Sequence, residues 1–570
     1  MASATTTAIR PARWLCIFGI VVVLLANLVP AAGAAAKEAE EDAAKLEPAL
    51  ARAVAAQPDG RFNVIVTRVP AADRAKRAAH RGEVEEQVRR EGGRVHGTLN
   101  LVGGHLATLP GRAVLRLARN PHVQGISLNH KVKLTSAVAT LASQIAATDV
   151  LAANAPAVWG AYGNQGQGVT VAVLDSGINP NPDLPAAVFG VDTVSGTVTL
   201  ADKGGHGTHV AGIVAGTGQQ SGGAYEGVAP AARVLMVKVT DDQGSASYAT
   251  MIRGLEWVVA NARTYNIKVA NMSLGATPVS GYAADPLDAA VEMAWFRGVT
   301  VVASAGNAGP GPSTVTVPGN DPYVLTVGAF DDNQTAAAAD DAIPDWTSRG
   351  PTLFDGLAKP DVVASGRRVV SLRVAGSYLD RLLPDRVTAT NYFRLSGTSM
   401  AAPVVAGVAA LVLAQNPSLT PNQVKYAIKA TAHPMPNIPA AVQGAGQVDA
   451  LAAVQLAARG VSAARANAGQ TPNRKTASAI WTVAKSLPPI WRVKGWYAGR
   501  SWVDGSWDQS GFKRQDGSWD DGAWDATAWA NLDWEDMAWQ DGSWDDGSWD
   551  DGSWDASEWD TADTQPNVIP

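Results

Sequence analysis

Four residues in the middle of the chain have types and positions that could together hydrolyse an acyl bond. Asp175 ends the apolar segment VTVAVLD, and His206 stands among glycines in GGHGTHVAG. Asn307 follows the apolar segment VVASAG, and Ser399 opens a long apolar stretch in SGTSMAAPVVAG. Each residue alone also has a structural interpretation as a turn or helix-cap residue. Only their combination points to chemistry.

The combination matters because nucleophilic catalysis needs several groups at once. A hydroxyl nucleophile needs a base, the base needs a carboxylate that orients it, and the developing oxyanion needs fixed hydrogen-bond donors. Ser399, His206 and Asp175 can fill the first three roles, and the Asn307 amide can fill the fourth. The chain order Asp, His, Ser differs from that of chymotrypsin-like peptidases and of α/β-hydrolases.

These motifs, in this order, resemble those of the subtilisin-like serine peptidases, and the similarity extends from about Gln165 to Ala458. The resemblance implies that Ser399 attacks the scissile carbonyl and that His206 takes and returns the proton. It also implies that Asp175 holds the imidazole, and that Asn307 binds the oxyanion with the Ser399 N–H. His209 belongs to the same motif but is not the base, and no cofactor is required for the chemistry.

The substrate is expected to be a protein or peptide rather than a nucleic acid, acted on by a monomer. The resemblance implies that the backbone of Ser273, Leu274 and Gly275 in NMSLG pairs with an extended substrate, opposite Ala305 and Gly306. An alternative is a noncatalytic surface protein that uses this fold for adhesion. Such a protein would have lost a catalytic residue, and none is lost here. A hydrolase of other esters or amides is a weaker alternative.

The same region predicts the fold. Apolar strand-like segments alternate with helical stretches, which predicts an α/β domain with a subtilisin-like parallel sheet and helices on both faces. We assign this peptidase domain to residues 156–458. Because ligands bind at the carboxyl ends of strands in such folds, we expect the four residues to meet there. The strand-like segments are VTVAVL, RVLMVKV, KVANMSL, VTVVASA and YVLTVGAF.

Residues 37–134 predict a separate small domain. Strand and helix patterns alternate in a βαββαβ order, which is typical of a ferredoxin-like α+β domain. The segments NVIV and NPHVQGISLNHKVKL resemble parts of the inhibitory propeptide of subtilisin-like peptidases. The resemblance implies a precursor that cleaves itself and is inhibited by its own propeptide. Residues 135–155 are an Ala-rich junction.

The N-terminus has the layout of a secretory signal peptide over residues 1–36. Arg10 and Arg13 precede the uncharged apolar run from Trp14 to Val29, and small residues follow. An uncleaved membrane anchor is the alternative, but the run is short for a span. The only cysteine, Cys16, lies in this segment, so cysteine catalysis is excluded. We expect a secreted protein.

Two positions depart from the family pattern. Val404 stands where many relatives have His, at a packing position. The segment TGQQSGGAYEGVAP lacks the Asn-rich loop that binds calcium tightly in bacterial subtilisins, which puts that site in doubt. Structural calcium elsewhere is left open.

The C-terminal part of the chain, residues 459–570, has a different character. Residues 459–500 are predicted to be a basic linker, and residues 501–570 form an acidic tail with 18 acidic and 2 basic side chains. Eleven Trp lie in this tail, most of them five residues apart, which matches neither helix nor strand. We favour a disordered adhesive tail that retains the enzyme at the cell surface over a repeat module. Either one would bind a polymer such as cell-envelope glycan through the Trp rings.

Overall fold

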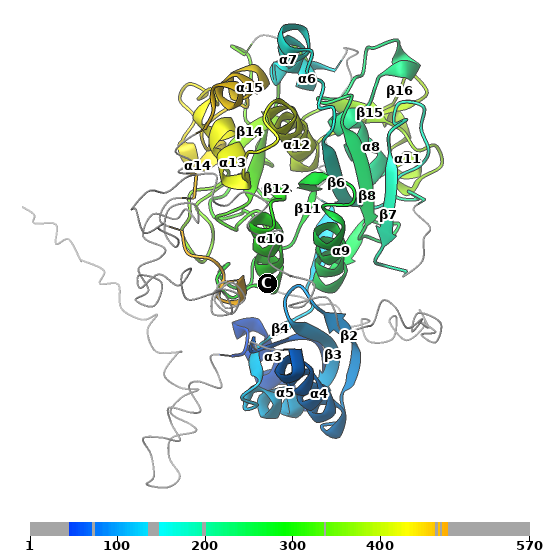
Figure 1. Ribbon diagram of the computed structural model, residues 1–570. Coiled ribbons are helices and arrows are strands. Elements are labelled where there is room, and N and C mark those ends of the chain that lie inside the picture. The colour runs from blue at the N-terminus through cyan, green and yellow to red at the C-terminus, as the bar shows by residue number, and fades with distance from the viewer. Residues whose placement is uncertain are drawn as a thin grey trace, which may run out of the picture.

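The protein consists of a small N-terminal unit and a larger catalytic unit, shown as a computed structural model in Figure 1. The structure describes residues 45–70, 74–134, 147–195, 201–335, 338–461, 466–467 and 470–476. The predicted signal peptide, most of the junction and the whole acidic tail lie outside the described residues.

The small unit has the ferredoxin-like order that the sequence predicts. Its antiparallel sheet has the order β2-β3-β1-β4, and two helices connect the strands. One helix, α3 (Pro48–Ala56), precedes this pattern and was not predicted. The other elements are β1 (Arg61–Arg68), α4 (Arg74–Arg90), β2 (Arg94–Leu99), β3 (Gly104–Pro110), α5 (Gly111–Ala118) and β4 (Val123–Leu128).

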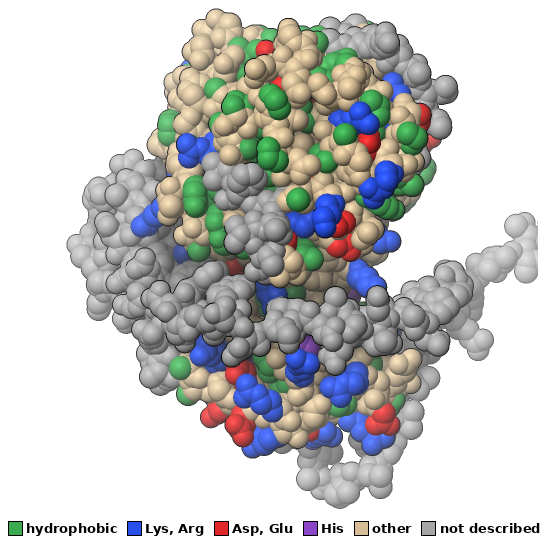
Figure 2. All heavy atoms as spheres, turned by 90° about the vertical axis from the view of Figure 1, so that its right-hand side faces the viewer, with side chains coloured by type: hydrophobic (Ala, Val, Ile, Leu, Met, Phe, Trp, Pro, Cys, Tyr) green, Lys and Arg blue, Asp and Glu red, His purple; other side chains and the backbone are tan. Residues whose placement is uncertain are grey.

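The small unit has its own apolar core and a basic surface. Leu50 of α3, Val64 of β1 and Leu117 of α5 are fully buried in one cluster. Lys and Arg side chains gather on the exposed face in Figure 2. This core is the reason why the segment forms a domain, since burial of apolar side chains is the main favourable term in folding.

The catalytic unit is built on a seven-stranded parallel sheet, as predicted. The strand order is β14-β13-β12-β10-β6-β8-β7. All neighbouring strands run parallel. The strands are β6 (Thr170–Asp175), β7 (Val188–Asp192), β8 (Arg233–Lys238), β10 (Ile267–Met272), β12 (Thr300–Ser304), β13 (Leu325–Phe330) and β14 (Val362–Ser365).

Helices cover both faces of this sheet. On one face, α8 (His206–Ala215) and α12 (Thr398–Gln415) pack into one apolar core, and on the other α9 (Tyr248–Asn261) and α10 (Pro286–Phe296) pack into a second. In the described part of the chain, α12 alone is long and apolar enough to cross a membrane. Because 89% of it is buried inside the protein, it is the central core helix.

The remaining elements surround this core. They are α6 (Thr148–Ala152), α7 (Ala155–Tyr162), η1 (Gln219–Ser221), β15 (Val369–Leu372), α11 (Tyr378–Leu382), η2 (Pro384–Arg386), β16 (Val387–Thr388), β17 (Tyr392–Leu395), α13 (Pro421–Ala430), α14 (Ala440–Gln443) and α15 (Ala450–Arg459).

The small unit docks on the side of the catalytic unit that α9 and α10 form (Figure 1). The Glu256 carboxylate in α9 accepts a hydrogen bond from the Leu101 N–H at 2.6 Å. Leu99 and Leu106 of the small unit share an apolar cluster with Leu255 of α9. The interface is therefore both apolar and hydrogen-bonded.

The last strand of the small unit enters the catalytic unit as the middle strand of a three-stranded antiparallel sheet. Strand β5 (Lys131–Leu134) lies between β11 (Leu274–Gly275) and β9 (Ser245–Ser247), and it is antiparallel to both. Leu134 pairs with Leu274, and Lys133 pairs with both Gly275 and Ser245. The end of the small unit thus occupies a backbone groove.

Residues 470–476, which the sequence places in the basic linker, pack against the catalytic unit. The Asn473 N–H donates to the Glu292 carboxylate of α10 at 2.8 and 3.0 Å, and Asn473 is fully buried. The hydroxyl of Tyr282 donates to the Thr471 carbonyl at 2.8 Å. The folded unit therefore continues beyond Ala458.

Candidate active site

The sequence-predicted catalytic residues lie at ends of the central elements. Asp175 is the last residue of β6, His206 is the first residue of α8, and Ser399 is the second residue of α12. Asn307 follows three residues after β12. Strand β6 therefore presents its final carboxylate at the carboxyl edge of the sheet, as expected for this class of fold.

Asp175 and His206 form a buried hydrogen-bonded pair. His206 Nδ1 lies 2.8 Å from Asp175 Oδ1 and 3.0 Å from Oδ2, and both residues are fully buried. Because a carboxylate accepts hydrogen bonds, Nδ1 carries a hydrogen, and Nε2 is the ring nitrogen left for proton exchange. His206 Nε2 is buried without a hydrogen-bond partner among the described residues. This arrangement is the one that an oriented general base requires.

Ser399 is hydrogen-bonded to Ser273, the residue before β11. Its Oγ donates to the Ser273 carbonyl at 2.8 Å, and the Ser273 Oγ donates to the Ser399 carbonyl at 2.8 Å. To pass its proton to His206, the Ser399 hydroxyl must turn away from Ser273. Such rearrangement is common, since catalytic hydrogen bonds often form only with substrate in place.

Asn307 is fixed by Thr398, the residue before the nucleophile. Asn307 Oδ1 accepts hydrogen bonds from the Thr398 N–H and Oγ1, both at 3.0 Å. A backbone N–H only donates, so the amide atom that faces it must be the oxygen. The NH₂ group of Asn307 therefore points to the other side, where it can serve as an oxyanion donor.

Two residues that the sequence analysis missed hold the start of α8. The Asp202 carboxylate accepts hydrogen bonds from the Ser176 hydroxyl and the Gly205 N–H at 2.7 Å, and from the Thr208 N–H at 2.8 Å. The Ser176 hydroxyl in turn accepts from the Gly207 N–H at 2.9 Å. Burial raises the pKa of Asp202, and these donors oppose the rise. Asp202 and Ser176 thus anchor the turn that carries His206.

His209 has a structural place. Its Nε2 lies 2.8 Å from the Phe393 carbonyl, and burial lowers its pKa to about 3. A neutral ring that donates to a carbonyl of β17 joins α8 to that strand. This placement agrees with the prediction that His209 is not the base.

The peptide groove has a second wall that the sequence analysis did not find. Leu274 and Gly275 pair with β5, as predicted for an extended ligand, but the strand on the other side of β5 is β9 rather than Ala305 and Gly306. The Leu134 N–H donates to the Gly244 carbonyl at 3.1 Å, next to β9. A three-residue strand such as SAS has too little pattern to be predicted.

Ala305 and Gly306 line a neighbouring part of the site. The Ala305 carbonyl accepts from the Thr316 N–H at 2.9 Å. A Cβ on Gly306 would lie 2.7 Å from Thr316 Cγ2, and one on Gly275 would lie 2.3 Å from Thr316 Oγ1. Both positions therefore need glycine, because any side chain would collide with Thr316. Thr316 connects Gly275 of β11 to the segment that follows β12.

The groove also accepts an apolar side chain. Val132 of β5 is fully buried in the cluster that contains Tyr248, Met251 and Leu274. Its neighbours in β5, Lys131 and Lys133, are exposed. Successive side chains of an extended peptide point to opposite sides. In β5, Val132 therefore enters the apolar pocket, and Lys131 and Lys133 face the solvent.

The loop after α8 is held by the Asp183 carboxylate, which lies before that helix in the sequence. The Asp183 carboxylate accepts a hydrogen bond from the Gln220 N–H at 2.8 Å and another from the Tyr392 hydroxyl. No group of three or more His, Cys, Asp or Glu suited to a metal ion is found in the residues that the structure describes. The presence of structural calcium therefore stays a prediction that the sequence leaves open.

Comparison with known proteins agrees with this geometry. The sequence profile of the Subtilase family matches residues 166–465, more than half of the chain. This chain belongs to the subtilase family. As a subtilase it is a serine-type endopeptidase, and the parallel sheet described above is the subtilisin-like sheet predicted from the sequence.

Several characterised subtilases are similar to it. Serine protease AprX of Bacillus subtilis is 44% identical over 295 residues, which cover 50% of this chain and 66% of AprX. Subtilisin E of the same organism is 33% identical over 374 residues, which cover 65% of this chain and 86% of subtilisin E. The family profile ends at residue 465, before the acidic tail begins.

A solved structure supports the fold. Fervidolysin from Fervidobacterium pennivorans, described as a keratinolytic enzyme related to subtilisin, aligns with a TM-score of 0.55 and 23% identity. The alignment covers 70% of this chain and 61% of fervidolysin. At this identity the similarity supports the architecture and says nothing of substrates.

Proposed function

We propose that this subtilase is a secreted precursor whose peptide hydrolysis is carried by Asp175, His206, Ser399 and Asn307. The observation that carries the proposal is the path of β5. This strand pairs with β11, which directly follows the hydrogen-bond partner of Ser399, and it ends at Leu134. A segment that fits the groove as a strand has the geometry of a bound substrate or product.

The reaction follows from the contacts in the site. Ser399 Oγ attacks the scissile carbonyl carbon while its proton passes to His206 Nε2, and Asp175 stabilises the resulting imidazolium. The carbonyl oxygen becomes an oxyanion bound by the Asn307 NH₂ and the Ser399 N–H. His206 then protonates the leaving amine, which departs, and an acyl-enzyme remains. A water molecule, deprotonated by His206, hydrolyses the acyl-enzyme and restores Ser399.

The strand register indicates where the precursor is cut. Leu134 pairs with Leu274, and the same register continued by one residue, beyond the described part of the chain, would set Thr135 opposite Ser273. The Ser273 carbonyl holds the Ser399 hydroxyl, and the residue opposite it is therefore nearest to the nucleophile. We place the maturation cut between Thr135 and Ser136.

The small unit acts as an intramolecular inhibitor in this proposal. Its end fills the groove through β5, and its body binds α9 through Glu256 and an apolar contact. Added as a separate chain, residues 37–134 should inhibit the mature enzyme competitively. The same chain ending at Asn129, which lacks β5, is the matched control and should inhibit much less. Equal inhibition by both chains would contradict the role of β5.

Secretion and surface retention complete the proposal. The signal-peptide pattern of residues 1–36 and the Trp-rich tail support them. Sedimentation with cell envelopes or insoluble glycan should be lost in a chain that ends at Arg500. Equal sedimentation of the two chains would exclude retention by the tail.

A further inference from the structure

Lys475 connects the C-terminal part of the folded chain with the small N-terminal unit. Its Nζ donates a hydrogen bond to the Arg68 carbonyl at 2.9 Å. Arg68 is the last residue of β1, so the two partners are 407 residues apart in the sequence. Lys475 belongs to the described residues beyond position 465, which are 466–467 and 470–476 and are called the C-terminal segment below.

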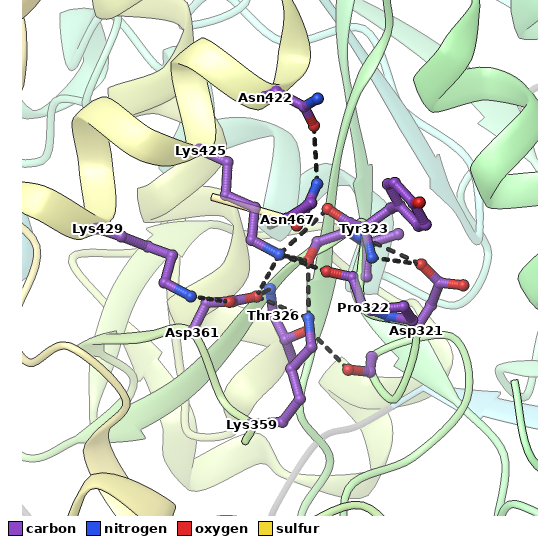
Figure 3. A network of polar contacts seen from close by, with 12 residues as sticks. Asp321, Pro322, Tyr323, Thr326, Lys359, Asp361, Asn422, Lys425, Lys429 and Asn467 are labelled. Atoms are coloured by element: carbon purple, nitrogen blue, oxygen red, sulfur yellow. Dashed lines mark hydrogen bonds and ion pairs between the residues drawn. The ribbon is translucent and has the colours of Figure 1, made fainter. Parts of the chain in front are cut away.

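The C-terminal segment is attached to the catalytic unit at its start. Asn467 is buried, and its Nδ2 donates to Asn422 Oδ1 of α13 at 2.8 Å (Figure 3). The Tyr323 hydroxyl donates to the Gln470 carbonyl at 3.2 Å. The catalytic unit therefore sets the path of this segment before it reaches the small unit.

The residues around Lys475 are held on α10, which lies on the side where the small unit docks (Figure 1). The Thr476 hydroxyl donates to the Ala289 carbonyl of α10 at 3.2 Å, and the Asn473 N–H donates to Glu292 of the same helix. Asn473 and Thr476 are fully buried. The Lys475 N–H donates to Asn473 Oδ1 at 2.8 Å. Contacts within the catalytic unit thus fix the backbone of Lys475, and docking has to order only its side chain.

Arg68 belongs to the part of the small unit that docks. The Arg68 N–H and Nε both donate to the Gly103 carbonyl, at 3.0 and 3.1 Å. Gly103 ends the loop that contains Leu101, whose N–H donates to Glu256 of α9. The contact with Lys475 therefore adjoins the loop through which the small unit binds α9.

We propose that the C-terminal segment is part of the surface that binds the small unit, with Lys475 as its contact residue. The inference rests on the proposed role of the small unit as an inhibitor. The groove around β5 and helix α9 supply the other contacts. An ammonium group that donates to a carbonyl makes a charge-assisted hydrogen bond, which contributes more than a neutral one. The C-terminal segment thereby slows release of the small unit after the maturation cut.

Two properties of this contact define what it recognises. The acceptor is a backbone carbonyl, so the contact depends on the path of β1 rather than on the Arg68 side chain. The donor lies beyond residue 465, where the family profile ends. A catalytic unit that ends near residue 465 should therefore hold the small unit less tightly than one that keeps Lys475.

The test measures inhibition of the mature enzyme by the separate chain of residues 37–134. Lys475→Ala and Arg474→Ala are made in the full precursor, and each mature enzyme is titrated with this chain. The inhibition constant of Lys475→Ala should be about 5-fold to 10-fold higher than that of the parent, because a charged but partly exposed hydrogen bond is lost. Arg474→Ala removes the same charge at an exposed neighbour and should leave the inhibition constant unchanged.

Hydrogen exchange in the uncut precursor is the second measurement, with Ser399→Ala in every chain. Lys475→Ala should speed exchange of the Leu101 and Gly103 amides at least about 3-fold, and Arg474→Ala should not. If the separate chain does not inhibit the parent enzyme, the inhibitor role of the small unit is refuted, and exchange decides whether the contact exists. Exchange also decides if maturation removes residue 475. Equal inhibition constants of Lys475→Ala and an inhibited parent would overturn the proposal, and so would equal exchange.

Discussion

Ser399 and Ser273 exchange two hydrogen bonds, each 2.8 Å long. The nucleophile's hydroxyl donates to the backbone of the substrate-binding edge, and the hydroxyl of that edge donates to the backbone of the nucleophile. These two hydrogen bonds fix the position of Ser399 relative to the strand that forms the groove. A peptide that pairs with β11 would be placed next to Ser399, whose hydroxyl then has only to turn from the Ser273 carbonyl toward His206.

Asn307→Leu should lower kcat about 100-fold to 1,000-fold and leave KM nearly unchanged, which is the effect of removing one such donor in subtilisin. The reason is that the amide contacts the oxyanion rather than the ground-state substrate. Steady-state kinetics on a short peptide provide the measurement. An unchanged kcat would exclude the oxyanion role of Asn307.

Asp202→Ala should destabilise the fold by roughly 3 kcal/mol or more, because it leaves three buried donors without their charged acceptor. It should also lower kcat, since the turn that holds His206 loses its anchor. Urea unfolding and kinetics measure the two effects. Asp345→Ala, at a carboxylate of the catalytic unit that is 92% exposed, is the control and should change neither. Stability equal to that of the parent would contradict the anchoring role.

Asp149→Asn should stabilise the protein at alkaline and neutral pH and have little effect near pH 4. Burial and the nearby Asp332 raise the pKa of Asp149 from 3.8 to about 7. The folded state therefore keeps a proton that the unfolded state releases, so the wild-type protein loses stability as pH rises from about 4 to 7. The full difference is of the order of 4 kcal/mol above pH 7.

Urea unfolding at pH 4, 5.5 and 8 measures this difference, with Ser399→Ala in both chains. The stability of Asp149→Asn relative to its parent should grow with pH through that window. Asp59→Asn is the exposed control. A difference that is independent of pH would show that Asp149 does not titrate in this range.

Two truncations test the extent of the folded unit. A chain that ends at residue 465 lacks Asn473. The backbone N–H of Asn473 donates to the Glu292 side chain, and its side-chain NH₂ donates to the carbonyl of Asp285 at 2.8 Å. We expect its Tm to fall by several degrees, because the buried carboxylate of Glu292 loses its backbone donor. A chain that ends at Arg500 keeps these contacts and should retain both Tm and peptide hydrolysis. Equal Tm of the two chains would show that residues 470–476 add nothing to the fold.

The positions of the proposed catalytic residues at element ends could be predicted, because each stands next to a clear pattern in the sequence. Asp175 ends an apolar strand, His206 follows two glycines, and Ser399 opens an apolar helix. The strands of the central sheet follow from the same contrast between buried apolar segments and the turns between them.

The supporting contacts could not be predicted, because they depend on residues without a pattern. Asp202 in ADKGG looks like any turn residue, and β9 is only three residues long. Residues 470–476 are attached through backbone groups and Asn473, so no apolar periodicity reveals them. Lys425 reads as an exposed helical lysine, although tertiary packing buries it.

The most direct test of the account is the intact mass and N-terminal sequence of the purified precursor after incubation. The wild-type chain should yield a catalytic fragment that begins at Ser136, and Ser399→Ala should stay uncut when incubated alone. Addition of a trace of mature enzyme should then cut the Ser399→Ala precursor at an accessible site, which shows that the substrate is intact. Cleavage of isolated Ser399→Ala at the same bond and rate as the wild type would contradict the assignment of Ser399 as the nucleophile.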